Sequence, residues 1–204
     1  MPTTAADIIV SARYDLRDEF STQYTDAMLL DYLNRGLRSL TAVLSLLHSD
    51  WVNTSATLTL LISSSSVALP ALFIADLKAK IGTSELTKYS VPALREELAL
   101  NTVAGVPTGY CIQGTNMLFD RVTDAQYSVV LEYNAGIADL TTATTMPFNN
   151  DFNDVLRQFI ILCGKSRNEY VVVSDATMQD YFYDACYSKL VSRNNAPNLY
   201  RTDF

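Results

Sequence analysis

The sequence is poor in the residues from which catalytic and metal sites are most often built. Its 204 residues include one histidine and three cysteines. A structural zinc site needs about four nitrogen or sulfur ligands, and three scattered cysteines with one histidine do not supply a spaced set. A nucleophile–histidine device would have to use His48, and its neighbours Ser49 and Asp50 do not face it from adjacent positions at a helix end. No glycine-rich loop precedes a helix in the way that a phosphate site requires. We therefore predict no enzyme, no cofactor and no metal.

The carboxylate pairs have ordinary explanations. Asp18-Glu19 and Glu96-Glu97 are expected on solvated surfaces, and Asp151 with Asp154 is expected at the positive end of a helix. The cysteines, Cys111, Cys163 and Cys186, are odd in number and lack C-x-x-C spacing. They lie in apolar patterns, which predicts buried free thiols in a reducing compartment.

Charge is also scarce. Only 18% of the residues are charged, and the net charge is −7. Proteins that grip nucleic acid need clustered cations, and no dense Lys/Arg run is present. We expect DNA to pass such a surface without specific binding. A low-charge chain rich in Thr, Ser, Asn and Tyr favours a protein that is buried in an assembly.

Long apolar runs are missing. The segment from Leu58 to Ile62 is far too short for a membrane-spanning helix, which needs about 20 apolar residues. The first residues, Met1 to Glu19, lack the basic start and apolar core of a signal peptide. We expect no membrane partner and synthesis in the cytoplasm.

Helical periodicity is strong at both ends of the chain. One apolar stripe runs through residues 5–19, and Thr25 or Asp26 is predicted to cap a longer helix to about His48. Gly36 lies within that second stripe, where glycine costs about 1 kcal/mol relative to alanine. Close packing of another helix is the expected compensation. Further helices are predicted from Asn150 or Asp151, and from Ser174-Asp175 to Leu190.

The middle of the chain has a period of two. Residues 56–62, 66–69 and 85–90 are predicted strands, residues 72–81 fit a strand or a short helix, and residues 91–100 fit a short helix. Three alternating segments follow, and they predict a three-stranded antiparallel meander. The alternating residues are Tyr110 and Ile112; Met117 and Phe119; and Tyr127, Val129, Leu131 and Tyr133.

The predicted fold is a single α+β domain. Residues 1–50 and 148–193 form a bundle of terminal helices, residues 51–147 form an inserted antiparallel β region, and residues 194–204 form an extended C-terminal tail. The tail is polar but carries large apolar side chains, which leaves two interpretations open. It is either a frayed terminus or a segment that docks on a partner through aromatic anchors. The candidate docking residues are Arg193, Leu199, Tyr200, Arg201 and Phe204.

Several segments of the chain resemble one known family in their order and in their sequence motifs. They are ARYDLRDE followed by TDAMLLDYLNRGLRSL, then KYSVPALREEL, GVPTGYCIQGTNMLFDRVTDAQYSVVLEYNAG, and finally Met146-Pro147-Phe148 with DFNDVLRQFI. This series is similar to the head-to-tail adaptor (connector or head-completion) proteins of tailed bacteriophages.

The resemblance implies a structural virion protein at the head–tail junction, assembled in the host cytoplasm. Such proteins form a ring, usually a dodecamer, that docks under the portal protein, extends the DNA channel and provides the attachment surface for tail or neck proteins. In that family, helical bundles form the ring wall, β regions face the tail or the neighbouring subunits, and C-terminal tails reach into crevices of the portal. Two alternatives remain. The first is another tail-side or receptor-proximal structural protein of the virion. The second is a small hydrolase, which would depend on His48 or on a carboxylate pair.

Overall fold

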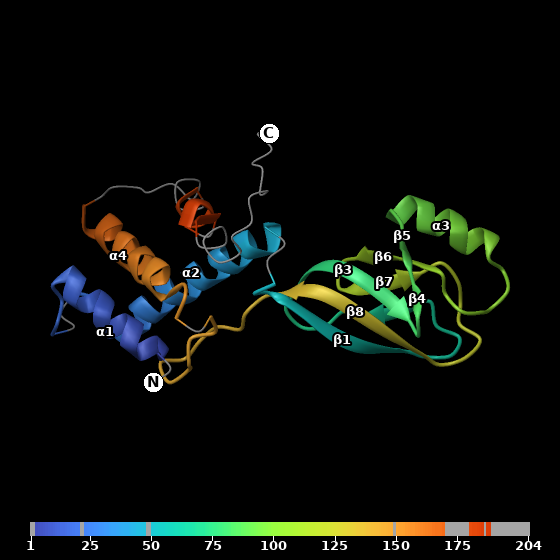
Figure 1. Ribbon diagram of the computed structural model, residues 1–204, viewed down its shortest axis with the longest axis horizontal. Coiled ribbons are helices and arrows are strands. Elements are labelled where there is room, and N and C mark those ends of the chain that lie inside the picture. The colour runs from blue at the N-terminus through green and yellow to red at the C-terminus, as the bar shows by residue number, and fades with distance from the viewer. Residues whose placement is uncertain are drawn as a thin grey trace. The chain divides into compact units, whose positions relative to one another are not determined.

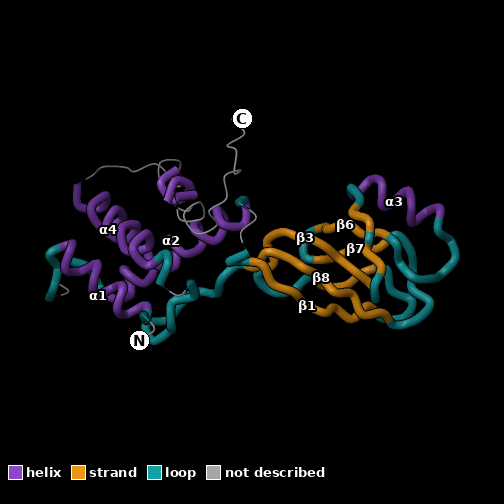
Figure 2. The backbone as a smooth tube through the Cα atoms, viewed as in Figure 1, coloured by secondary structure: helices purple, strands orange, loops and turns teal. Residues whose placement is uncertain are grey.

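The chain divides into two compact units, seen in a computed structural model that describes residues 3–20, 23–47, 50–148, 150–169, 180–185 and 187–188. The first, the helical unit, comprises Met1–Trp51 and Ile137–Phe204. The second, the β unit, is the single segment Val52–Gly136. Figures 1 and 2 show the helices α1, α2 and α4 in the first unit and the strands with α3 in the second.

The helical unit begins with two well-capped helices. Thr4 caps α1 in a capping box with Asp7, and the Thr25 side chain accepts a hydrogen bond from the Met28 N–H at the start of α2. These contacts satisfy backbone N–H groups that have no partner within the helix. The labelled helices of the unit are α1 (Ala5–Leu16), α2 (Asp26–Leu46) and α4 (Asn153–Glu169), and residues 180–185 and 187–188 are also helical.

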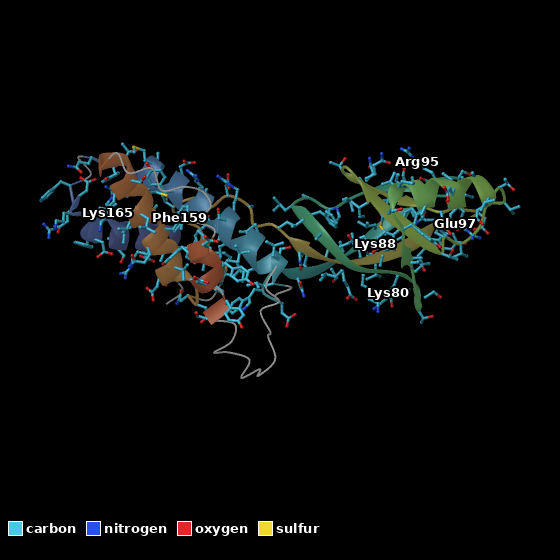
Figure 3. The ribbon with its side chains drawn as sticks, turned by 90° about the horizontal axis from the view of Figure 1, so that it is seen from above. Lys80, Lys88, Arg95, Glu97, Phe159 and Lys165 are labelled. Atoms are coloured by element: carbon cyan, nitrogen blue, oxygen red, sulfur yellow. The ribbon has the colours of Figure 1, made fainter. Side chains whose placement is uncertain are left out.

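Two glycines set close approaches between these helices. A Cβ atom added at Gly36 of α2 would lie 2.8 Å from Cδ1 of Phe159 on α4. One added at Gly164 of α4 would lie 2.9 Å from Cδ2 of Leu16. The close packing expected at Gly36 is therefore confirmed, and Phe159 of α4 is the residue that requires it (Figure 3).

A buried arginine joins the end of α1 to the start of α2. Arg13 donates to the Asp18 carboxylate at 3.2 Å, to the Tyr24 carbonyl at 2.7 Å and to the Asp26 carboxylate at 2.5 Å. Asp18 also accepts from the backbone N–H groups of Gln23 and Tyr24, at 3.0 and 2.8 Å. The side chains of Arg13 and Asp18 are both buried. Each neutralises the charge of the other and also forms hydrogen bonds with backbone groups of the loop between the helices.

The β unit consists of two four-stranded sheets. The first has the order β1-β8-β3-β4, and the second has the order β2-β7-β6-β5. The strands of the first sheet are β1 (Asn53–Leu60), β3 (Phe73–Ile81), β4 (Ser84–Glu85) and β8 (Tyr127–Ala135). Those of the second are β2 (Ser66–Ala68), β5 (Thr87–Lys88), β6 (Gly109–Gln113) and β7 (Asn116–Phe119), and the helix α3 (Val91–Leu100) follows β5.

One apolar cluster joins the two sheets. The strictly alternating residues of β8 provide Val129, Leu131 and Tyr133, while Met117 and Phe119 come from β7 of the other sheet. Met117, Phe119, Val129 and Leu131 are each 0% exposed. The two inner faces therefore form the core of this unit, as in other face-to-face sheet packings.

The expected architecture, a bundle of terminal helices with an inserted antiparallel β region and an extended C-terminal tail, is wrong. The fold is α+β with two sheets, one of them mixed, and it is not dominated by a helical bundle. β5 pairs with β6 in parallel, through Thr87 with Gly109 and Lys88 with Tyr110, and α3 lies within the β unit. The error arose in the β region: β4 and β5 have two residues each and are too short to produce a period. The tail itself lies outside the described residues.

The predicted meander is wrong in its third strand. β6 and β7 do form an antiparallel hairpin, but β8 leaves that sheet and lies between β1 and β3 of the other. Alternation of apolar and polar residues is the same whichever strand becomes the neighbour, so the pattern identifies strands without identifying their partners.

Smaller corrections concern boundaries. The segment expected over 72–81 as a strand or a short helix is strand β3, Phe73–Ile81, and the single strand expected over 85–90 is the pair β4 and β5. α4 begins at Asn153, later than the Asn150 or Asp151 start expected, because Asn150 has a φ of 72°, outside the helical region. The predicted cap at Ser174-Asp175 lies outside the described residues.

Candidate functional site

The residues first singled out for binding cannot be placed. Arg193, Leu199, Tyr200, Arg201 and Phe204 all lie outside the described residues, as does His48. The prediction that the tail carries the docking site therefore stays a prediction.

The carboxylate pairs divide into one buried and several exposed groups. Asp18, which was expected at the surface, is 2% exposed and bonded to Arg13. This correction has a simple cause: the partner, Arg13, lies five residues earlier and across a helix end, where no local pattern reveals it. Asp151, Asp154 and Glu96 are exposed, while Glu97 is partly buried. No group of three or more His, Cys, Asp or Glu side chains gathers in a metal-binding arrangement among the residues described.

A polar pocket of about 510 Å³ lies in the β unit where the chain crosses from β4 to β5. At its base is the Asp76 carboxylate of β3, whose side chain is 6% exposed. It accepts a hydrogen bond from the Tyr110 hydroxyl at 2.7 Å and one from Nζ of Lys88 at 2.8 Å. At the rim, Nζ of Lys78 lies 2.5 Å from Glu85. The full lining is Asp76, Leu77, Lys78, Glu85, Leu86, Thr87, Lys88 and Tyr110.

These contacts explain the direction in which the pKa values of Asp76, Tyr110 and Lys78 are shifted. Burial raises the pKa of Asp76, but the hydrogen bonds from Lys88 and Tyr110 and the charge of Lys88 outweigh it and hold that pKa below the usual range. Burial, the hydrogen bond to Asp76 and the nearby carboxylates raise the pKa of the Tyr110 hydroxyl. The hydrogen bond to Glu85 raises the pKa of Lys78.

These groups form a structural cluster and not a reactive one. A nucleophile or a general base needs a pKa near the working pH, whereas here the pKa of Tyr110 and that of Lys78 are raised and that of Asp76 is lowered, each away from neutral pH. Because Lys88 and Tyr110 belong to one sheet and Asp76 to the other, the cluster ties the two sheets together. Lys80 and Lys88 are labelled on this unit in Figure 3.

The cysteines of the described residues are free thiols. Cys111 and Cys163 are both buried and unpaired by any disulfide, which confirms the expectation for these two. Burial raises the pKa of both thiols, to about 11 for Cys163. Thiols in this state are weak nucleophiles. Cys186 lies outside the described residues.

Exposed apolar side chains gather around the loops of the β unit. Leu61 and Ile62, directly after β1, are 60% and 61% exposed, and Val103 is 78% exposed. Backbone hydrogen bonds hold these loops to a third one: the Ser63 N–H donates to Thr123 at 3.0 Å, and the Gly105 N–H donates to Val122 at 2.9 Å. We call Leu61, Ile62, Val103, Val106 and Val122 the loop patch. Exposed apolar groups gathered in this way are typical of surfaces that bind other proteins.

Comparison with known protein families identifies the family of this chain. The model of the SU10 adaptor protein family matches residues 3–192. The chain belongs to the SU10 adaptor protein family. Among curated proteins, no sequence matches it.

Membership confirms the resemblance to phage head-to-tail adaptors. The chain is a structural adaptor protein of a bacteriophage, a component of the virion that interacts with other head or tail proteins. Adaptors of this family are typically not enzymes. Within the described parts of the chain, no helix is both long and apolar enough to cross a bilayer. The family match ends at residue 192, just before Arg193.

Sequence reasoning missed both the pocket and the loop patch. The pocket joins residues that are up to 34 positions apart, and nothing in a single sequence pairs Asp76 with Tyr110. The loop patch left one signal: Leu61 and Ile62 continue an apolar run past the end of a strand, into a turn where polar residues are usual.

Proposed function

We propose that the protein forms a dodecameric ring of identical copies under the portal of the filled capsid. This ring extends the DNA channel and provides the surface to which tail or neck proteins attach. The observation that carries the proposal is the family match over residues 3–192. A low charged fraction, 18%, and the exposed apolar loop patch agree with a protein that is enclosed by partners.

The division into two units supports a ring. Copies related by rotation in a closed ring contact each other through two different patches, since each copy presents one patch to the preceding neighbour and another to the following one. A helical unit and a β unit, each with its own core, supply chemically distinct surfaces for this purpose. The helical unit would form the wall, and the β unit would face the tail or neighbouring subunits.

DNA passes through this ring without being gripped. The net charge of −7 repels phosphates, and binding to DNA depends on neutralising them. A lumen lined with acidic and uncharged groups would let DNA slide. A reconstructed ring with a basic lumen would refute this part of the proposal.

Docking on the portal is assigned to the C-terminal tail. Its anchors are Leu199, Tyr200 and Phe204, with Arg193 and Arg201 among them, in a segment otherwise polar. Large apolar side chains of this kind form the energetic centres of many protein interfaces.

Deletion of residues 194–204 tests this assignment. The truncated chain should keep the circular dichroism spectrum and unfolding transition of the full chain but should not join purified portal rings in a sedimentation assay. The matched control is replacement of Asn194, Asn195 and Asn198 by serine, which preserves the anchors and should leave joining unchanged. If the truncated chain joins portals as the full chain does, the tail is not the docking element. If neither chain joins, the protein belongs to the tail side of the virion.

A further inference from the structure

The edge of the first sheet formed by β1 is a long, open strand. In antiparallel pairs, residues that exchange both backbone hydrogen bonds alternate with residues that exchange none. The Ala135 N–H donates to the Val52 carbonyl at 2.9 Å, one step before the pair Asn53 and Asn134. It follows that Thr54, Ala56 and Leu58 direct their backbone groups toward β8, and that Ser55, Thr57 and Thr59 direct theirs away from it.

The outward backbone groups of Ser55, Thr57 and Thr59 have no partner in the described part of the chain. Among the strands that the structure describes, β1 is hydrogen-bonded to β8 alone and forms the edge of its sheet. No hydrogen bond among the described residues involves the backbone of Ser55, Thr57 or Thr59 outside that pairing. Their side chains are exposed, while Ala56 and Leu58 on the inner face are half-buried against the core.

The other edge of the same sheet is protected, which makes the contrast informative. Natural proteins blunt edge strands with bulges, charges, prolines or short length. β3 has register shifts at Phe73/Ala75 and Asp76/Lys78 and carries charged side chains along its length. Its far end is also covered by β4, whose Glu85 pairs with Lys78.

β1 has none of these protective features. Its eight residues, Asn53–Leu60, include no charge and no proline, and its pairing with β8 has no register shift. The edge strands of the second sheet are much shorter, three residues in β2 and two in β5. An uncharged edge of this length, without a bulge, readily accepts another strand.

We propose that β1 receives an extended segment of a different virion protein, which adds a strand to this sheet. The inference rests on the proposed function, because it takes the partner from the neighbours of the adaptor in the particle. The incoming segment has small apolar side chains at alternate positions on its inner face, where they cover Ala56 and Leu58. Its outer face is uncharged and polar, matching Ser55, Thr57 and Thr59. At the end of β1, it meets the exposed Leu61 and Ile62 of the loop patch.

A second copy of this chain is the less suitable occupant. If two β1 edges paired with each other, the contact would be two-fold and would close on itself as a dimer. A ring of identical copies repeats one contact between two different patches, so a β1–β1 contact cannot recur around it. Pairing of two β1 edges therefore has no place in the ring, and we assign the edge to a strand of another protein.

Amide hydrogen exchange of the wild-type chain tests the proposal directly. The free protein should show fast exchange at Ser55, Thr57 and Thr59 and slow exchange at Thr54, Ala56 and Leu58. In particles reconstituted with the portal and neck proteins of the same phage genome, exchange at the three outward amides should slow about tenfold, the factor that one typical net hydrogen bond supplies. Unchanged exchange at these amides in the particle overturns the proposal.

A proline variant tests the same edge independently. Thr57→Pro removes one outward N–H group and leaves the bonds to β8 in place, since proline is tolerated where a strand faces solvent. The matched control, Thr57→Val, keeps that N–H. Only the proline variant should lose binding of the neck protein whose segment occupies the edge. Equal binding of the neck protein by both variants contradicts the proposal. The proposal is also contradicted if the wild type sediments as a dimer and Thr57→Pro abolishes that dimer, because a second copy would then occupy the edge.

Failure of this proposal and failure of the adaptor function give different results. If the chain sits under the portal but its outward amides remain unprotected, the edge proposal is wrong and the adaptor function stands. If the chain is absent from the portal, the adaptor function is wrong whatever the exchange rates show.

Discussion

At the scale of single residues, Gly36 shows how one missing side chain determines the distance between two helices. The sequence indicated a close approach at this position, because glycine within a strong apolar stripe needs a compensation. It did not indicate the partner. Phe159 lies more than 120 positions away, and its ring occupies the space that a Cβ atom would need.

Replacing Gly36 with alanine should destabilise the helical unit. Alanine favours the helix by about 1 kcal/mol, but the new Cβ would lie 2.8 Å from a buried aromatic ring. Overpacking of this kind costs about 1–3 kcal/mol, so the net free energy of unfolding should fall. Urea unfolding measures the change. The double variant Gly36→Ala with Phe159→Leu should lose less than the sum of the two single variants, and strict additivity would show that the contact is not the cause.

Replacing Tyr110 with phenylalanine should weaken the β unit in a pH-dependent way. The variant removes one hydrogen bond to the ionised Asp76 carboxylate, which should lower the free energy of unfolding by about 1–2 kcal/mol at neutral pH. The pKa of Asp76 is lower in the folded state. Its contribution is therefore present above the unfolded pKa, about 3.9, and is lost as the pH falls through the folded value.

The difference between the wild type and Tyr110→Phe should accordingly narrow below about pH 4. Chemical unfolding at a series of pH values measures it. The control is Tyr127→Phe, whose hydroxyl bonds to Asp124 at 2.6 Å on the exposed surface and whose loss should leave stability unchanged. A Tyr110→Phe effect that is constant from neutral to acid pH would contradict this account of Asp76.

At the scale of elements, the sequence predicted where helices and strands lie better than how they pair. Leu29, Leu33 and Leu37 repeat with the helical period, so α2 was predictable within a few residues. The strands were equally visible, but β8 was assigned to the wrong sheet. Its alternation fits any neighbour, and the choice of β1 and β3 depends on a core assembled from distant residues. β4 and β5 are too short to produce a period at all.

The connection between α1 and α2 depends on Arg13. Replacing it with methionine would leave the Asp18 carboxylate, whose side chain is 1% exposed, without its cation. Breaking a buried pair in this way costs about 3–5 kcal/mol. The control is Arg38→Met, whose partner Asp139 is 64% exposed, and which should cost at most about 1 kcal/mol. Thermal and urea unfolding compare them. Equal effects of the two variants would show that burial of the pair does not matter.

At the scale of the whole molecule, the two units should be separable. The β unit is one continuous segment, Val52–Gly136, and its ends are joined by a hydrogen bond between Ala135 and Val52. Segments with their own core and adjacent ends often fold alone. A protein consisting of residues 52–136 should therefore unfold cooperatively and give a dispersed NMR spectrum. Residues 1–51, which lack α4, should not fold, since isolated helices are marginal in water. A disordered 52–136 fragment would contradict the division.

The central claim is that this adaptor forms a ring under the portal. The most direct measurement is co-sedimentation of the purified protein with the portal ring of the same phage genome, followed by negative-stain imaging of the peak. The account predicts a second ring stacked under the portal, and the image gives its copy number. Absence of any association, with a portal that still binds its other partners, would contradict the account and place the protein on the tail side of the virion.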